Sequence, residues 1–400
     1  MLMRYTTWVG SLMAMLFVGG FLGTHSSGCA PAVSEPNVEQ AVEKAHETVS
    51  ESTQADAGGQ ETNAQEPVLD MGPEPTPQEP TQEPVGEERV EGIVEVDASV
   101  MPEPELIPEP TQESGPEVQP EIPSDRAWRD VKYANVSRKQ SLHIFLPPTG
   151  NGPFPVVVWV HGGGWQSGSK NLAANAYQRS ALTRGYALVS VGYRLSGEAI
   201  FPAQIHDVKT AIRFLRANGQ HYALDTKKLG VWGASAGGHL VALLGTSAGV
   251  TALEGETLGY KGQSSRVQAV VDWFGPTNFL TMDTDAKTAG CARSNHSGPN
   301  SPESRMIGGQ ITQMQAAVKL ASPLTHITKD DPPFFIQHGD KDCTVAYPQS
   351  EALRDGLKAT GINVPVSMEI LKGAGHSDPA FKTAANVKKV LDFFDKYIKP

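Results

Sequence analysis

The sequence predicts an α/β fold, in which one mostly parallel sheet carries helices on both faces. Apolar strand patterns alternate with helical patterns between about residues 128 and 398. The run FPVVVWV at 154–160 is apolar throughout, which is typical of a strand covered on both faces. A further strand pattern passes into a helical pattern through the tight turn GASAG at 233–237. Strands that alternate with helices in this way favour a parallel sheet between two layers of helices.

The expected elements can be assigned in chain order. Strand patterns occupy 142–146, 154–160, 186–193, 229–232, 267–274, 333–338 and 366–371, and helical patterns occupy 171–184, 203–218, the residues after Ser235, and 387–398. Residues 283–315 interrupt this alternation and are rich in Ser, Asn, Gly and Pro. We expect them to form a small insertion over the carboxyl ends of the strands, where ligands bind in such sheets.

The N-terminal residues differ in composition from the rest of the chain. Residues 1–29 combine Arg4 with an apolar run at 8–22. This run is shorter than the roughly 20 residues that cross a bilayer, so we expect a signal peptide. The sequence SSGC at 26–29 resembles a bacterial lipoprotein cleavage box, in which Cys29 becomes lipidated, and ordinary signal cleavage nearby is the alternative. These features predict export from a bacterial cell. A lipid anchor would hold the protein at the outer surface or in the periplasm, and without an anchor it would be secreted.

Residues 31–124 are predicted to be a disordered acidic linker rich in Pro and Glu. The segment holds 15 of the chain's 30 prolines, 23 acidic residues and two basic residues. A chain with few apolar residues and high net charge cannot offset the entropy cost of folding. We therefore expect a tether ahead of one folded domain at 125–400. That domain carries a net charge of +9 without a basic stripe interleaved with aromatic residues, so we expect no nucleic-acid partner.

The turn at 233–237 contains the first candidate for chemistry. Gly233 and Gly237 flank Ser235, and the helical pattern begins at the serine. A sharp strand–turn–helix of this kind exposes a serine hydroxyl and is called a nucleophile elbow. The free N–H groups of the helix then point toward developing negative charge. Ser235 is therefore the predicted nucleophile.

A nucleophilic serine needs a base that takes its proton and an acid that orients the base. After an elbow, the acid and then the base follow along the chain. His376, in KGAGH at 372–376 after the last expected strand, fits this order as the base. The acid is expected from the loop HGDKDC at 338–343. Asp342 lies farther out in this loop and is favoured, and Asp340 is the alternative.

Three glycines follow the strand at 154–160 directly, in HGGGW at 161–165. Glycines let backbone N–H groups approach a reacting oxygen without an intervening side chain. We predict that the N–H groups of Gly163, Gly164 and Ala236 form an oxyanion hole for a tetrahedral intermediate. A phosphate-binding loop is disfavoured, because no Lys-Ser/Thr pair follows the glycines.

Several motifs together resemble the α/β-hydrolase superfamily. They are HGGGW at 161–165, GYR at 192–194, FPAQIHD at 201–207, GASAGG at 233–238 and HGDKD at 338–342. The chain resembles the hormone-sensitive-lipase-like esterases. The sequences at 264–279, 300–309 and 329–340 are most similar to the bacterial branch of feruloyl and acetylxylan esterases.

This resemblance implies an α/β-hydrolase catalytic domain at 125–400 that acts as a serine esterase through an acyl-enzyme. It also implies acetyl or feruloyl esters on plant polysaccharide, or similar small-acyl esters, as substrates. The alternatives within enzymes are a general carboxylesterase or lipase and an arylformamidase-like hydrolase. The alternative outside enzymes is a surface binding protein that keeps the fold without turnover.

The remaining candidates concern the pocket and the cysteines. Trp165, Trp273 and Phe274 either line an acyl pocket or belong to the core. Cys291 and Cys343 form an even pair, predicted to be a disulfide in an oxidising compartment, with two free thiols as the alternative. No residues have metal-ligand spacing and no cofactor is indicated, so the ester substrate is the expected partner.

Overall fold

The computed structural model describes residues 124–292, 294–361 and 365–399. The predicted signal peptide at 1–29, the lipidation site Cys29 and all but the last residue of the predicted linker lie outside the described residues. Those assignments therefore stay predictions, and the description below concerns the described part of the chain.

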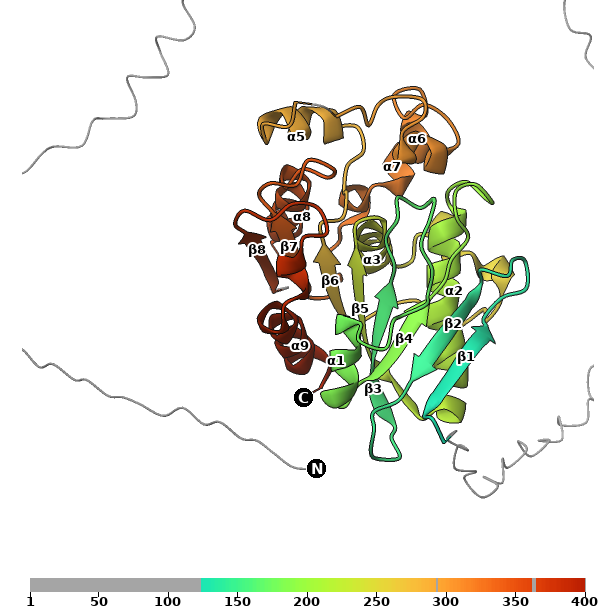
Figure 1. Cartoon of the computed structure of the whole chain (residues 1–400). Coiled ribbons are helices and arrows are strands. Elements are labelled where there is room, and N and C mark those ends of the chain that lie inside the picture. The colour runs from blue at the N-terminus through green and yellow to red at the C-terminus, as the bar shows by residue number, and fades with distance from the viewer. Residues whose placement is uncertain (1–123, 293, 362–364, 400) are drawn as a thin grey trace, which may run out of the picture. The chain divides into compact units, whose positions relative to one another are not determined.

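Eight strands form a single sheet in the order β1-β2-β4-β3-β5-β6-β7-β8 (Figure 1). The strands are β1 (Ala127–Lys132), β2 (Ser141–Phe145), β3 (Phe154–Val160), β4 (Ala187–Val191), β5 (Leu224–Ala234), β6 (Ala269–Trp273), β7 (Phe334–Gly339) and β8 (Val366–Leu371). β2 pairs antiparallel with both β1 and β4, whereas every other neighbouring pair is parallel. The mostly parallel sheet expected from the sequence is confirmed.

Helices cover both faces of this sheet. The α-helices are α1 (Ser180–Thr183), α2 (Ala203–Asn218), α3 (Ala236–Thr246), α4 (Thr251–Glu254), α5 (Met282–Thr288), α6 (Pro302–Ile307), α7 (Gln315–Ala321), α8 (Pro348–Ala359) and α9 (Ala384–Ile398). Side chains of α2, α3 and α8 share one hydrophobic core, and side chains of α1 and α9 share the core on the opposite face. None of the helices in the described residues is both long and apolar enough to cross a bilayer.

β3 shows why the central strands have continuous apolar sequences. Val156 and Val158 belong to the core shared with α2 and α3, whereas Val157 and Trp159 belong to the core shared with α1 and α9. Successive side chains of a strand point to opposite faces. A strand with a core on each side therefore needs an apolar residue at nearly every position.

The prediction of a helix at 171–184 is wrong for most of these residues. Regular structure there is limited to a 3-10 turn at Tyr177–Arg179 and to α1. Tyr177 packs edge to face against Trp159 and Trp232. This packing of aromatic rings, rather than helical periodicity, sets the path of the segment.

Several of these elements were not indicated by the sequence, among them β1 and α8. β1 is an edge strand whose residues are mostly partly or fully exposed, so its sequence lacks an apolar run. α8 buries Leu353 and Leu357 on one face. Both elements lie toward the edges of the sheet, where the apolar pattern is weakest.

The expected insertion at 283–315 covers most of α5 and all of α6. In Figure 1, α5, α6 and α7 lie beyond the carboxyl ends of the parallel strands. A disulfide joins Cys291 to Cys343 in the loop after β7, with the Cα atoms 5.5 Å apart. The predicted cysteine pairing is therefore present, and it ties the insertion to the loop that carries the two candidate acids.

Candidate active site

The serine elbow lies between β5 and α3. Ser235 is the residue between them, with φ 57° and ψ −123°. A positive φ at a non-glycine residue costs of order 1–3 kcal/mol and persists only where the surroundings enforce it. Here the N–H of Ser235 donates to the Trp273 carbonyl at 2.9 Å, and the Ser235 carbonyl accepts from the His239 N–H at 2.9 Å. These bonds hold the strained turn at the carboxyl end of β5.

The two glycines of the elbow are required by close backbone contacts. A Cβ atom on Gly233 would lie 2.2 Å from the carbonyl oxygen of Gly237. A Cβ atom on Gly237 would lie 2.1 Å from the carbonyl oxygen of Val160, at the end of β3. Gly233 and Gly237, each two positions from Ser235, must therefore lack a side chain for the turn to close and to pack against the end of β3.

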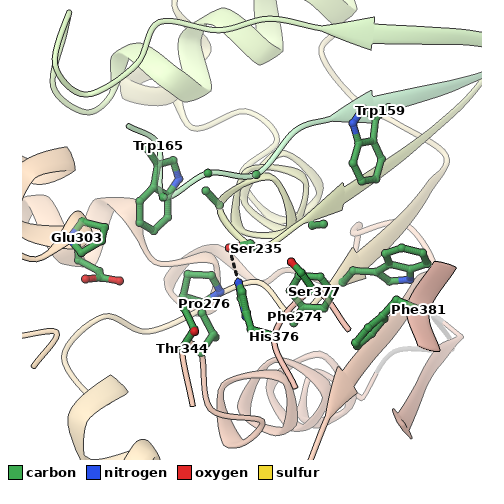
Figure 2. A pocket seen from close by; sticks show the side chains of 18 of the residues that line it. Trp159, Trp165, Ser235, Phe274, Pro276, Glu303, Thr344, His376, Ser377 and Phe381 are labelled. Carbon is green, nitrogen blue, oxygen red and sulfur yellow. Dashed lines mark hydrogen bonds between the residues drawn. The ribbon is translucent and has the colours of Figure 1, made fainter. Parts of the chain in front are cut away.

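The structure brings Ser235, His376 and Asp342 into one hydrogen-bonded series. His376 Nε2 lies 2.9 Å from Ser235 Oγ, and His376 Nδ1 lies 2.6 Å from Asp342 Oδ2. Figure 2 shows His376 pointing toward Ser235. The carboxylate accepts the Nδ1–H, so Nε2 is the nitrogen that accepts the serine proton.

Asp342 is buried, and each of its carboxylate oxygens has partners. Oδ1 accepts the N–H groups of Thr344 and Val345, both at 2.9 Å. Oδ2 lies near the imidazoles of His376 and His338, 3.4 Å from His338 Nε2. Burial by itself raises the pKa of this carboxyl, but hydrogen bonds from His338 and His376 outweigh burial and hold the pKa well below its usual value. Asp342 is therefore ionised and able to stabilise an imidazolium at His376.

Asp340, the alternative acid, occupies a different position. Its carboxylate accepts the N–H of Gly373 at 2.6 Å and lies 3.4 Å from Lys372 Nζ. The Asp340 carboxylate therefore braces the loop that leads to His376, but it makes no hydrogen bond to the imidazole among the described residues.

The predicted oxyanion donors lie beside the serine. Gly163 and Gly164 have φ of 112° and 58°, which favour glycine. These two residues and Ala236 line the same cavity as Ser235. Among the described residues, none accepts a hydrogen bond from the N–H groups of Gly163, Gly164 or Ala236. The three donors remain available for an oxygen of a ligand.

Two bonds hold the glycine loop in place. The Tyr193 hydroxyl donates to the His161 carbonyl at 2.9 Å. The Ser196 N–H donates to the Trp165 carbonyl at 2.7 Å. Both donors belong to the segment after β4, so this segment positions the loop that carries the oxyanion donors.

A cavity of about 560 Å³ surrounds Ser235 and His376. Trp165, Trp273 and Phe274 line it and are each at most 2% exposed. These aromatics are therefore core residues whose inner surface forms part of the wall of the cavity, and their role in an acyl pocket stays a prediction. The ring of Phe274 lies 4.8 Å from that of His376 between centroids.

Sequence reasoning did not assign several further residues of the cavity wall to the site, and six of them matter for the shape and polarity of the cavity. They are Trp159, Tyr177 and Phe381 among the aromatics, and His296, Pro302 and Glu303 from the insertion. Trp159 was assigned only to a buried strand, and nothing in the local sequence of the other five indicates a pocket. Figure 2 shows Ser235 between Trp165 and Glu303 on one side and Trp159 and Phe381 on the other.

Other buried titratable groups near the site have structural partners. Burial lowers the pKa of His239 and of His161 to about 4, so both imidazoles are neutral at pH 7. His239 Nε2 bonds the Ala321 carbonyl at 2.8 Å. Burial raises the pKa of Asp272 to about 6. In the part of the chain that the structure describes, no group of three or more His, Cys, Asp or Glu side chains is placed to hold a metal ion.

This geometry supports acyl transfer. A serine with an oriented imidazole, a buried carboxylate and preorganised N–H donors provides a nucleophile, a general base and an oxyanion site. The second described cavity, lined by residues such as Asn278 and Lys319, contains no such set of groups.

Comparison with known sequences places this site in a family context. The sequence pattern of the BD-FAE family matches residues 142–357, which is more than half of the chain. "Esterase LipC" of Mycobacterium tuberculosis is 32% identical over 224 residues, covering 56% of this chain and 53% of the relative. "Esterase LipQ" of the same organism is 30% identical over 263 residues, covering 65% of this chain and 58% of the relative. The chain thus spans between half and two thirds of these curated relatives.

Solved structures give a similar result. A protein described as "Bifunctional GH43-CE", from Bacteroides eggerthii, is 38% identical with a TM-score of 0.62, over 68% of this chain and 35% of that chain. A "truncated form of carbohydrate esterase from gut microbiota" is 33% identical with a TM-score of 0.62, over 68% of this chain and 95% of that chain.

Proposed function

The chain belongs to the BD-FAE family of α/β-hydrolase serine esterases, and from this membership we propose that it hydrolyses carboxylic esters through an acyl-enzyme. The observation that carries the proposal is the hydrogen-bonded series of Ser235, His376 and Asp342 beside N–H donors to which no described residue offers an acceptor. That arrangement matches the requirements of ester cleavage step by step.

In the first step, Ser235 Oγ attacks the ester carbonyl carbon while His376 Nε2 takes the hydroxyl proton. The carbonyl oxygen becomes an oxyanion that accepts the N–H groups of Gly163, Gly164 and Ala236. Each such donor contributes about 3–4 kcal/mol to the transition state by precedent. His376 then gives its proton to the leaving alcohol oxygen. Water repeats the sequence on the acyl-enzyme and releases the acid, with Asp342 stabilising the imidazolium each time.

For the substrate, we propose acetyl or feruloyl esters carried by plant polysaccharide. Three observations support this class. The first is the motif resemblance to feruloyl and acetylxylan esterases. The second is the similarity to two structures described as "Bifunctional GH43-CE" and as a "truncated form of carbohydrate esterase". The third is a cavity that offers an aromatic wall of Trp159, Trp273 and Phe381 for a small or aromatic acyl group.

A panel of esters tests both the proposed ester hydrolysis and the proposed substrate class. We expect turnover of p-nitrophenyl acetate together with acetylated xylan or methyl ferulate. Preference for long-chain p-nitrophenyl esters would instead indicate a lipase, and turnover of N-formylkynurenine would indicate an arylformamidase. A protein that cleaves none of them and is not labelled by a fluorophosphonate would be a binding protein.

We also propose that the protein is exported and anchored through a lipid on Cys29. The disulfide between Cys291 and Cys343 supports an oxidising compartment. Labelled palmitate should be incorporated into the full chain in a bacterial host and not into the Cys29→Ser variant. Equal labelling of the two would contradict the anchor.

A further inference from the structure

The insertion contributes a second carboxylate–imidazole pair to the cavity. His296 lies in the loop between α5 and α6, and Glu303 lies in the first turn of α6. Both line the cavity that contains Ser235 and His376. Figure 2 shows Glu303 on the Trp165 side of Ser235. The pair therefore shares the cavity with the catalytic series, but the proposed steps do not use it.

Glu303 is held deep in the wall of the cavity. Its side chain is 5% exposed, and its Oε1 lies 3.2 Å from His296 Nδ1. Its Oε2 is buried and has no hydrogen-bond partner among the described residues. A buried carboxylate is costly unless it is paired. The His296 imidazole is the group that pairs with it.

His296 is fixed on one side and open on the other. Its backbone N–H and that of Ser297 donate to the Asp283 carboxylate at 2.8 and 2.9 Å. Its side chain is 14% exposed, with Nδ1 toward Glu303. Its Nε2 makes no hydrogen bond to any described residue and is not fully buried. Nε2 is thus available to a ligand in the cavity.

The surroundings of His296 favour its charged form. Burial lowers the pKa of this imidazole, but the hydrogen bond to Glu303 and the negative charges of Glu303, Asp283 and Asp342 outweigh burial, so the pKa is raised. A protonated His296 offers its Nε2–H as a donor to an oxygen atom.

We propose that His296 binds a hydroxyl oxygen of a sugar on the alcohol side of the ester, and that Glu303 is the residue that positions the imidazole. This inference rests on the proposed function and specifies how the site selects its substrate. A hydroxylated alcohol provides a partner for Nε2, whereas a plain alkyl alcohol leaves it unpaired. Sites built to bond a substrate hydroxyl discriminate against analogues that lack it.

The acyl group fits the opposite side of the cavity better. Trp159, Trp273 and Phe381 are at most 5% exposed and form an apolar wall there. On the insertion side, Pro302 and Thr344 are exposed at the rim, which leaves room for a saccharide that continues into solvent.

Two esters with the same acyl group test the proposal. Methyl 2-O-acetyl-β-D-xylopyranoside and cyclohexyl acetate both carry an acetyl group on a six-membered ring, but only the xyloside has free hydroxyl groups. We expect His296→Gln to lower kcat/KM for the xyloside ester by about tenfold, mainly through KM, the size expected for one lost bond to a charged group. For cyclohexyl acetate we expect a change of less than about twofold. His221→Gln, at an exposed histidine of the turn Gln220–Tyr222, is the matched control and should change neither.

Glu303→Gln tests the positioning role. Glutamine can still accept the Nδ1–H, but it removes the charge that favours the protonated ring. We expect a smaller rise in KM for the xyloside ester than with His296→Gln, and little change in kcat. Melting temperatures of all three variants should first establish that each is folded.

The results that overturn the inference differ from those that overturn the proposed function. Equal losses on both esters in His296→Gln, or no loss on the xyloside ester, would reject a role in hydroxyl recognition. Wild-type protein that cleaves p-nitrophenyl acetate but not the xyloside ester would reject it as well. Wild-type protein that cleaves no ester at all would reject the proposed function itself.

Discussion

The two sides of the cavity around Ser235 are built in different ways. On the aromatic side, Trp159 and Trp273 come from β3 and β6, and their rings belong to a core of the sheet. On the other side, His296 and Glu303 come from the insertion, which depends on local hydrogen bonds and on one disulfide. The sheet thus positions the nucleophile, the base and the apolar wall, while the insertion contributes a polar pair to the cavity. The two sides can be altered separately.

The largest expected effect concerns the serine at the end of β5. Ser235→Ala should lower kcat on p-nitrophenyl acetate by about 10⁵–10⁶-fold, because removal of the nucleophile leaves only binding and the oxyanion site. Fluorophosphonate labelling should disappear with it. Ser264→Ala, at an exposed serine, should keep both activity and labelling. Persistent labelling of Ser235→Ala would show that the nucleophile lies elsewhere.

The next effect separates the two aspartates of the loop after β7. Asp342→Asn should lower kcat by about 10³–10⁴-fold, because an amide at this position favours the wrong imidazole tautomer. Asp340→Asn should lower it far less, since its carboxylate bonds the Gly373 N–H and not the ring. Steady-state kinetics on p-nitrophenyl acetate measures both. The reverse order of effects would make Asp340 the acid.

The third prediction concerns the disulfide that joins the insertion to the loop after β7. The bridge closes a loop with a sequence separation of 52, so replacing Cys291 and Cys343 by Ser should lower the free energy of unfolding by at most about 4 kcal/mol. Urea unfolding of the wild type and the double variant measures this difference. Ser235, Asp342 and His376 lie in the segments that directly follow strands β5, β7 and β8. We therefore expect the folded variant to retain its turnover of p-nitrophenyl acetate. A loss of turnover without a loss of stability would show that the insertion also positions the triad.

The smallest effect concerns a buried carboxyl beneath the elbow. Asp272 lies at the end of β6, where its Oδ1 accepts the Gly275 N–H at 3.0 Å and its Oδ2 has no partner among the described residues. Burial raises its pKa from 3.8 to about 6. The folded protein therefore holds this proton more tightly than the unfolded chain. The resulting stabilisation is complete below pH 3.8 and is lost as the pH rises through about 6.

Compared with Asp272→Asn, the wild type should lose about 2 kcal/mol of stability between pH 4 and pH 7, because each pKa unit corresponds to about 1.4 kcal/mol and part of the shift titrates below pH 4. Urea unfolding at several pH values measures the difference. Asp330→Asn, at an exposed aspartate, should show no such trend. A difference that stays constant with pH would mean that Asp272 is ionised at its ordinary pKa.

The residues of the site that follow strands of the sheet could be predicted from local sequence. Gly233 and Gly237 around Ser235 reflect contacts that permit no Cβ atom, and this need is visible in the motif. The position of His376 follows from the order of residues along the chain. Of the two aspartates, the sequence favoured Asp342, and the structure brings that carboxylate to the imidazole.

The insertion and its disulfide were expected from the sequence, but the side chains that the insertion brings to the cavity were not. The bond from His296 to Glu303 depends on the path of a segment with no periodic pattern. That path is set by the carboxylate of Asp283, which accepts backbone N–H groups, and by Ser301, whose hydroxyl accepts the Ser304 N–H at the start of α6. The prediction of a helix at 171–184 was wrong for a similar reason, because the packing of Tyr177 against Trp159 and Trp232 outweighs helical propensity.

The tryptophans around the cavity also make ligand binding measurable by intrinsic fluorescence. The chain has six tryptophans, and three of them, Trp159, Trp165 and Trp273, line the cavity. Trp232 lies between two of these, with ring centroids 5.4 Å from Trp159 and 4.8 Å from Trp273. A ligand that enters replaces water at indole surfaces, so the intrinsic emission of the protein should change in wavelength and intensity. Occupancy can thus be followed by fluorescence without attaching a dye.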